Sequence, residues 1–140
     1  MFSMLEQIQK KDLGKLIVVS NRLPVVISQK EGKPHIVPGA GGLITAMAPL
    51  LKKHGGMWVG WIGWHEFSEE EVNIALSEFE KEAGFKLISI PLTKNEMETY
   101  YEGFSNEIIW PLFHDLHAFC NFDPAYWEGY QTVNKNLPRK

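Results

Sequence analysis

Residues 16–20 have the sequence LIVVS, and this short stretch decides the fold class. The first four residues are apolar and three of them are β-branched, while five residues are too few for a stable helix, so the pattern predicts a strand. No polar residue alternates with the apolar ones. We therefore expect both faces of the strand to be buried, as in the opening strand of a parallel α/β sheet.

Two extended segments follow this strand. Residues 25–28 and 35–37 contain β-branched residues at strand-like density, and the polar stretch between them includes Gly32. A glycine can adopt the positive φ that a tight turn requires. The pattern predicts a β-hairpin.

A helix and a second buried strand are expected next. The glycine pair at 55–56 should end this helix, which Pro49 should kink, and residues 57–62, MWVGWI, form another apolar run of strand length. Apolar residues recur at helical spacing on one face of the helix. That face contains Leu43, Ile44, Met47, Leu50 and Leu51.

The remaining elements are marked mainly by helix-start signals. Residues 68–71 and 93–96 have the Ser/Thr-x-x-Glu pattern of a capping box. Asp123-Pro124 fits an N-cap followed by proline at the first helical position, and residues 86–90 predict a third strand. Strands that alternate with helices predict an α/β fold with a mostly parallel sheet and a hairpin extension.

The chain has 140 residues, which is enough for one domain. Only three or four central strands are visible, and this is few for a complete doubly wound sheet, so we interpret the lobe as incomplete. Before the first strand, residues 4–11 predict a short amphipathic helix within an N-terminal extension.

Composition excludes several classes of function. The net charge is −3 and no dense basic run is present, so we expect no nucleic-acid-binding surface. No apolar run approaches the ~18 residues of a membrane span, and the N-terminus lacks the pattern of a secretory signal. Cys120 is the only cysteine, which rules out an internal disulfide. We expect a cytoplasmic protein that binds no membrane.

A polar triplet, Ser20-Asn21-Arg22, ends the first strand. Open α/β sheets bind ligands at the carboxyl ends of their strands, and an arginine there can hold a phosphate through two parallel N–H···O bonds. An arginine that pairs with a surface carboxylate explains the same residues equally well.

Three glycines, Gly39, Gly41 and Gly42, lie directly before the predicted helix. Such a turn exposes backbone N–H groups, and the helix start adds positive potential, so the turn can bind an anion. It lacks both the lysine of a Walker loop and the full GxGxxG spacing. A purely structural turn is the alternative.

Aromatic rings suit the apolar C–H faces of sugars, although most aromatic residues pack in cores. Tyr101 and Trp110 lie in YYEGFSNEIIWP (100–111), which we expect to be a polar turn, and they are candidate ligand-binding residues. For Trp127 and Tyr130, on the face of a predicted helix, packing is the preferred interpretation.

Other chemistry has little support. His114 and His117, with Asp115 between them, are too few for a metal site, which needs three or four converging ligands. Neither an HExxH nor a GxSxG motif is present. We expect no metal site and no hydrolase triad.

Taken in order, several segments resemble the trehalose-6-phosphate synthase family. The combination is specific, whereas any single segment would not be. The segments cover most of the chain after residue 15: LIVVSNRLP (16–24), PGAGGL (38–43), GGMWVGWIG (55–63), YYEGFSNEIIWPLFHD (100–115) and FDPAYWEGYQTVN (122–134).

The resemblance implies a two-lobe, Rossmann-like glycosyltransferase of the GT-B type. Residues 15–140 would be part of its N-terminal, acceptor-binding lobe, after an extension of residues 1–14, and the C-terminal donor-binding lobe would be absent. Such enzymes transfer glucose from a nucleotide sugar, usually UDP-glucose, to glucose 6-phosphate with retention, giving trehalose 6-phosphate, and need no metal or other cofactor. We expect the isolated chain to be inactive, and any homo-oligomer to form in the full-length protein.

The matching motifs also imply roles for particular residues. Arg22 and Tyr101 would hold the acceptor phosphate, and Trp110 would line the acceptor sugar. Gly41 and Gly42 would face the donor diphosphate through their backbone N–H groups. No residue is assigned as a catalytic base, because in this family the departing phosphate is thought to accept the proton.

Other interpretations stay open. A non-catalytic paralogue that binds or senses sugar phosphate would keep the same residues, and Arg22 would serve any phosphorylated acceptor of a related glycosyltransferase. A nucleotide-binding oxidoreductase ranks low, because Ser20-Asn21-Arg22 stands where its glycine fingerprint should follow the first strand. Trp61 lies in a matching motif but receives no definite contact.

Overall fold

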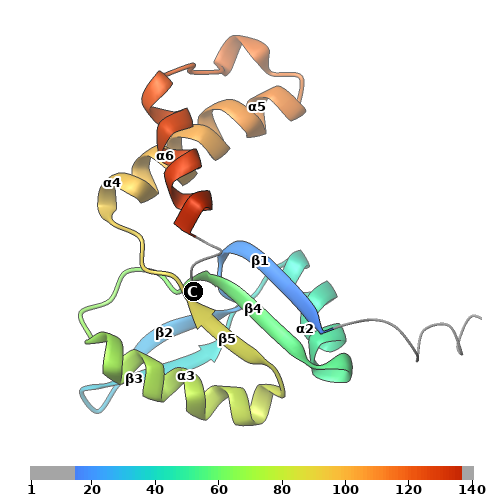
Figure 1. Ribbon diagram of the computed structural model, residues 1–140, viewed down its shortest axis with the longest axis vertical. Coiled ribbons are helices and arrows are strands. Elements are labelled where there is room, and N and C mark those ends of the chain that lie inside the picture. The colour runs from blue at the N-terminus through green and yellow to red at the C-terminus, as the bar shows by residue number, and fades with distance from the viewer. Residues whose placement is uncertain (1–14, 137–140) are drawn as a thin grey trace, which may run out of the picture. The chain divides into compact units, whose positions relative to one another are not determined.

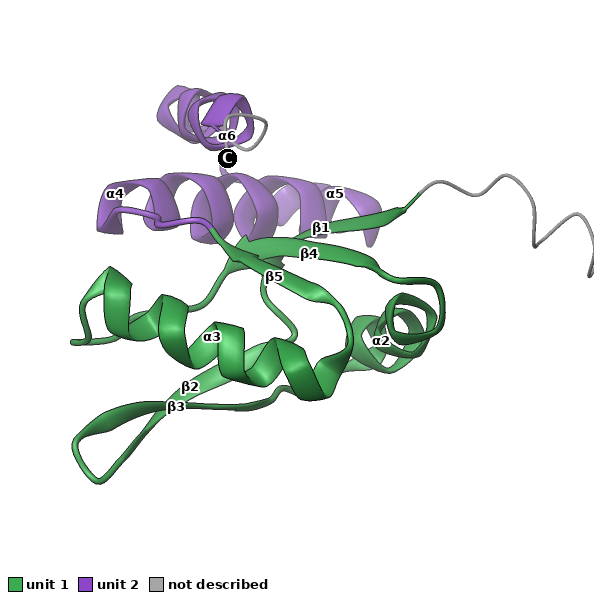
Figure 2. Ribbon diagram, turned by 60° about the horizontal axis from the view of Figure 1, so that its bottom comes forward, with its two compact units in different colours: residues 1–89 green, residues 90–140 purple. Residues whose placement is uncertain are grey.

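The computed structural model describes residues 15–136 of the chain. The chain divides into two compact units, unit 1 with residues 1–89 and unit 2 with residues 90–140 (Figure 2). The helix predicted for residues 4–11 lies outside the described residues.

The central feature of unit 1 is a parallel three-stranded sheet. Its strands are β1 (Leu16–Arg22), β4 (Gly56–Trp61) and β5 (Lys86–Ser89), in the order β1-β4-β5 (Figure 1). The three strands predicted from apolar runs are confirmed, and so is their parallel arrangement.

A separate two-stranded hairpin accompanies the sheet. Strands β2 (Val25–Lys30) and β3 (Lys33–Pro38) pair antiparallel from Val25 opposite Pro38 to Lys30 opposite Lys33. The two turn residues, Glu31 and Gly32, both have positive φ (53° and 76°), as a two-residue turn of the I′ kind requires. The predicted hairpin is confirmed.

Two helices complete unit 1: α2 (Gly42–His54) and α3 (Glu69–Ala83). The predicted capping box is present at the start of α3, where Ser68 and Glu71 exchange hydrogen bonds, and α3 ends at Gly84 in the left-handed conformation (φ 80°). Within unit 1, both helices and the hairpin lie on the same side of the sheet (Figure 2).

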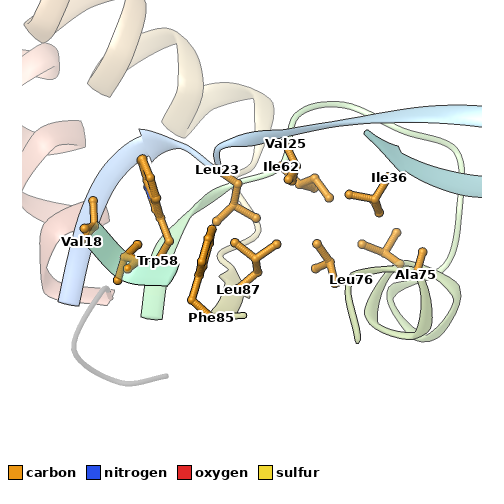
Figure 3. Packing of buried hydrophobic residues seen from close by; sticks show 12 residues of the cluster. Val18, Leu23, Val25, Ile36, Trp58, Ile62, Ala75, Leu76, Phe85 and Leu87 are labelled. Atoms are coloured by element: carbon orange, nitrogen blue, oxygen red, sulfur yellow. The ribbon is translucent and has the colours of Figure 1, made fainter. Parts of the chain in front are cut away.

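One hydrophobic cluster forms the core of unit 1 on that side of the sheet (Figure 3). Trp58 of β4 and Leu51 of α2 are fully buried, and they pack with residues such as Ile36 of β3 and Leu76 of α3. Burying a large apolar side chain contributes roughly 1.5–3 kcal/mol. This cluster therefore fixes the sheet, the hairpin and both helices relative to one another.

The prediction that β1 is buried on both faces is wrong. Val18 is buried, but Ile17 and Val19 are 56% and 54% exposed. Successive side chains of a strand point to opposite faces. Every other element of unit 1 lies on the face of Val18, so unit 1 offers no cover to the alternate residues.

The apolar face predicted for α2 is also narrower than expected. Leu51 is fully buried and Ile44 and Met47 are partly buried against the core, whereas Leu43 and Leu50 are 53% and 45% exposed. The helix contacts the sheet along one side only, so the two outer leucines of the predicted face lie beyond that contact.

Unit 2 is entirely helical. Segments α4, η1 and α5 follow one another as one continuous rod, and α6 packs across it (Figures 1 and 2). Thr93 and Glu96 form the predicted capping box, and Asp123 caps α6 by accepting a hydrogen bond from the backbone N–H of Ala125 at 2.9 Å. The elements are α4 (Lys94–Glu96), η1 (Met97–Ile109), α5 (Trp110–Phe113), η2 (His117–Phe119) and α6 (Pro124–Asn136).

The polar turn predicted over residues 100–111 is wrong, because this stretch is helical. Segment η1 is a π-helix, in which the backbone N–H of Trp110 donates to the carbonyl of Ser105, five residues earlier. Gly103 allows close packing of α6, since a Cβ there would overlap the ring of Tyr126. The polar residues Glu102 and Asn106 are exposed on the rod.

Trp127 and Tyr130 of α6 pack as predicted, in an aromatic group with Phe104. Tyr130 lies 4.4 Å from Phe104 and 5.5 Å from Trp127 between ring centroids. Trp127 remains half exposed, so this group is a surface stack rather than a closed core.

Among residues 15–136, none of the helices combines the length and the apolar character that a membrane span requires.

Candidate functional site

The carboxyl end of β1 departs from regular pairing. The register of β1 against β4 shifts between Val19 and Arg22, and Arg22 ends up opposite Trp61. Gly60 of β4 faces this irregular region, and a Cβ there would lie only 2.7 Å from the carbonyl oxygen of Ser20. A glycine is required because the two backbones approach closely where Ser20 and Asn21 interrupt the regular pairing of β1 with β4.

Ser20 has a structural role in the polar triplet. Its hydroxyl donates to the carbonyl oxygen of Arg22 at 2.6 Å and accepts the indole N–H of Trp58 at 2.8 Å. The backbone N–H of Leu23 donates to the carbonyl of Trp61 at 2.9 Å. These bonds hold the backbone on both sides of the Arg22 side chain.

The side-chain amide of Asn21 is unusual. Both its Nδ2 and its Oδ1 are buried, and neither forms a hydrogen bond within the described part of the chain. Buried polar atoms are rarely left without partners in native proteins. Asn21 is therefore not a ready ligand-binding group at the surface of unit 1, unlike its neighbour Arg22.

Arg22 presents an exposed positive charge. Its Cζ lies 4.8 Å from the ring centroid of Trp61, which is a cation–π arrangement. Among residues 15–136, none of the ion pairs involves Arg22. The alternative in which Arg22 is neutralised by a surface carboxylate thus finds no partner there, and its guanidinium N–H groups are available to an anion.

The glycine turn forms the start of α2. Gly41 is the N-cap residue with φ 140°, and its carbonyl oxygen accepts hydrogen bonds from both the backbone N–H and the hydroxyl of Thr45, each at 3.0 Å. Gly41 and Gly42 are exposed, and the first turn of α2 contains no acidic residue. The N–H groups of this first turn have no intrahelical acceptor and carry partial positive charge.

The structure connects the glycine turn to the segment that follows Arg22. The backbone N–H of Gly39 donates to the carbonyl of Pro24 at 2.8 Å, next to the pairing of Val25 with Pro38. A Cβ at Gly39 would come within 3.2 Å of the Pro24 backbone, so a larger residue would fit only if its neighbours shifted slightly. The two predicted anion-binding features therefore leave the hairpin at the same end.

Tyr101 and Trp110 belong to unit 2. Tyr101 lies within η1 and is half-buried, whereas Trp110 is the first residue of α5 and is 53% exposed. The Trp110 ring stacks on His114 with centroids 4.1 Å apart, and His114 Nδ1 lies 2.7 Å from the carbonyl oxygen of Trp110. His114 is thereby occupied by a structural contact.

The pKa of Tyr100, which precedes Tyr101 in η1, is raised above its ordinary value. Burial of the phenol is the main cause, and the nearby phenols of Tyr130 and Tyr101 add to it. Its phenol therefore stays neutral well above physiological pH.

Within the described residues no group of three or more histidine, cysteine, aspartate or glutamate side chains converges in a way that would hold a metal ion.

The sequence pattern of glycosyltransferase family 20 matches residues 14–140, nearly the whole chain. The chain belongs to this family. A trehalose-6-phosphate synthase of Mycobacterium sp. (strain JLS) is 37% identical to it over 122 residues, which make up 86% of this chain and 24% of that relative. The alpha,alpha-trehalose-phosphate synthase (UDP-forming) of Schizosaccharomyces pombe is 38% identical over 121 residues, 86% of this chain and 23% of that relative.

A solved structure of another protein has the same fold as this family 20 chain. It is an alpha,alpha-trehalose-phosphate synthase (UDP-forming) from Burkholderia xenovorans in complex with glucose-6-phosphate, with 30% sequence identity and a TM-score of 0.62. The match covers 90% of this chain and 25% of that one. The family resemblance and the predicted α/β, Rossmann-like fold are confirmed. The chain spans about a quarter of the length of the relatives it matches.

Three residues without an assigned role in the motifs lie against the Arg22 segment of this family 20 chain: Gly60, Trp61 and Gly63. A glycine inside an apolar run of strand length, as in MWVGWI, is a sequence signal for close backbone approach, and it marks Gly60. The contacts of Trp61 and Gly63 with Arg22 bring together residues about forty positions apart in the sequence, so no local sequence pattern predicts them.

Proposed function

We propose that this chain supplies the acceptor-phosphate site of an enzyme that transfers glucose from UDP-glucose to glucose 6-phosphate with retention, giving trehalose 6-phosphate. The observation that carries the proposal is Arg22: an exposed guanidinium at the sheet edge with no carboxylate partner among residues 15–136, at the same end of the hairpin as the glycine turn. Membership of glycosyltransferase family 20 supports it, and so does the glucose-6-phosphate bound by the Burkholderia xenovorans relative.

Each proposed contact follows from the chemistry of the side chain. The guanidinium of Arg22 suits the phosphate of glucose 6-phosphate because it can donate two parallel N–H bonds to it. The phenol of Tyr101 would donate a further hydrogen bond to the same phosphate, and Trp110 offers an exposed ring for the apolar face of the sugar.

The donor diphosphate is proposed to bind the glycine turn. Gly41 and Gly42 have no side chain to keep a ligand from the backbone, and the N–H groups at the start of α2 favour negative charge. In this family the departing phosphate is thought to accept the proton of the acceptor hydroxyl. The bond from the anomeric carbon to the diphosphate oxygen breaks while a bond to the acceptor oxygen forms on the same face. The residues of this chain would contribute orientation and charge stabilisation.

Calorimetric titration of the chain with glucose 6-phosphate, with glucose as the ligand that lacks the phosphate, tests the assignment of Arg22. Arg22→Ala should weaken glucose 6-phosphate binding by about 2–4 kcal/mol, since a charge-assisted bidentate contact is lost. A matched control is Lys53→Ala, which removes an exposed positive charge from the last turn of α2. Equal affinities of the wild type and Arg22→Ala for glucose 6-phosphate would refute the assignment.

Transfer is a separate test and needs the protein with the complete family 20 sequence. Incubation with UDP-glucose and glucose 6-phosphate should give trehalose 6-phosphate, detected by mass spectrometry. Binding of glucose 6-phosphate without product in that protein would favour a sugar-phosphate-binding or regulatory role. Product formation with only a different phosphorylated acceptor would show that glucose 6-phosphate is not the acceptor.

A further inference from the structure

The segment after β4 forms one side of the space that the Arg22 guanidinium occupies. Gly63 is buried and has φ 104°, a conformation that side chains rarely adopt. A Cβ at Gly63 would lie 2.8 Å from Nη2, 3.2 Å from Cζ and 3.3 Å from Nη1 of Arg22. Because a Cβ essentially never approaches a heavy atom to 2.8 Å, a side chain at residue 63 would push the guanidinium out of the position that it has here.

Trp61 provides a second contact with the same group. Its ring centroid lies 4.8 Å from Cζ of Arg22. The ring itself is fixed, because Trp61 is only 4% exposed and packs edge-on against Trp64 with centroids 4.9 Å apart. The hydrogen bond from Leu23 N–H to the Trp61 carbonyl ties the two backbones together at this point.

We propose that Trp61 and Gly63 are positioning residues for Arg22: they hold the guanidinium in one orientation before an anionic ligand arrives. An arginine side chain has many rotamers, and a group that is already ordered loses less conformational freedom on binding. Neither Trp61 nor Gly63 carries a formal charge, so their contacts order the cation without neutralising it. This inference rests on the proposed role of Arg22 as a phosphate ligand.

The ordering can be measured without any ligand. The ring current of Trp61 should shift the NMR signals of the Arg22 side chain away from their random-coil positions in the wild-type chain. Trp61→Phe keeps an aromatic ring and should keep much of the shift, whereas Trp61→Leu should abolish it. Random-coil shifts for Arg22 in the wild type would overturn the proposal even if every variant failed to fold.

Affinity for glucose 6-phosphate tests the consequence for binding. Gly63→Ala and Trp61→Leu should each weaken binding by about tenfold, and Trp61→Phe by clearly less. The matched control is Gly32→Ala, at another positive φ (76°) with no atom within 4 Å of the added Cβ, which should leave affinity unchanged. Unfolding curves of all variants report any general loss of structure.

A double-variant cycle separates this inference from the proposed function. In the Arg22→Ala background, Gly63→Ala should have no further effect on binding, because the group it positions is gone. An effect of the same size in both backgrounds, or full affinity in Gly63→Ala alone, would overturn the positioning role. A wild type that binds no glucose 6-phosphate but retains the shifted Arg22 signals would instead refute Arg22 as an acceptor ligand.

Discussion

Trp58 donates its indole N–H to the hydroxyl of Ser20 at 2.8 Å, and so links the largest fully buried side chain among the described residues to the strand end that carries Arg22. The same hydroxyl donates to the carbonyl oxygen of Arg22. One small side chain therefore satisfies a polar atom of the core and holds the backbone of the candidate site. Stability and ligand binding should both respond when it is removed.

Ser20→Ala is expected to destabilise the chain by about 1–3 kcal/mol, because the indole N–H of Trp58 is left without its acceptor in a buried position. Urea unfolding monitored by tryptophan fluorescence measures this loss. The control is Ser28→Ala, which removes an exposed hydroxyl that donates to the carbonyl of His35, and its effect should be much smaller. Equal losses for the two variants would contradict the structural role given to Ser20.

Glu71→Gln should change how stability depends on pH. Hydrogen bonds from the side chain and the backbone of Ser68 lower the pKa of Glu71 below its ordinary value of 4.5. A lowered folded-state pKa stabilises the fold above the unfolded pKa, and this contribution is lost as the pH falls through the folded pKa. The wild type should therefore lose stability below about pH 4.5 more steeply than Glu71→Gln.

Thermal unfolding of both proteins between pH 7 and pH 3 measures that difference in slope. Glu82→Gln, on the same helix α3 but outside the capping box, is the matched control for the loss of one carboxylate from this helix. Parallel stability curves for the wild type and Glu71→Gln would show that the capping box is not populated in solution.

Gly129→Ala should destabilise unit 2, although alanine is the better helix former by about 1 kcal/mol. A Cβ at Gly129 would overlap the side chain of Thr99, which is itself held by a 2.7 Å hydrogen bond to the carbonyl of Asn95. Overpacking of this kind costs typically about 1–3 kcal/mol. Circular dichroism during thermal unfolding measures the effect, and Gly42→Ala, where a Cβ meets no atom within 4 Å, should not lower the melting temperature.

The features that the sequence predicts correctly are local ones. Ser68 and Thr93 are each followed by glutamate at the third position, and Gly32 permits a positive φ, so these caps and this turn need no distant contact to be recognised. The apolar runs of β1 and β4 are predicted for the same reason. In each case a segment of a few residues is enough to predict the local structure.

The predictions that failed depend on contacts between distant segments. Whether Val19 is buried depends on which face of the sheet the helices cover, and a run of apolar residues does not contain that information. The polar turn predicted for residues 100–111 is wrong because α6 packs there, with the ring of Tyr126 against Gly103. In the candidate site Arg22 was predicted from its strand, whereas its contact with Gly63 required the folded backbone.

Tyr101→Phe tests the proposed acceptor role in unit 2. The variant keeps the half-buried ring and removes only the phenol O–H, so stability should stay near that of the wild type while glucose 6-phosphate binding weakens by about 1–2 kcal/mol. Tyr100→Phe is the matched control, because Tyr100 is the neighbouring tyrosine of η1, packs its ring 6.0 Å from that of Tyr130, and has no proposed ligand contact. Calorimetry with glucose 6-phosphate and with glucose compares the two variants. Weaker binding in Tyr100→Phe but not in Tyr101→Phe would reverse the assignment, since the phosphate would then depend on the other phenol.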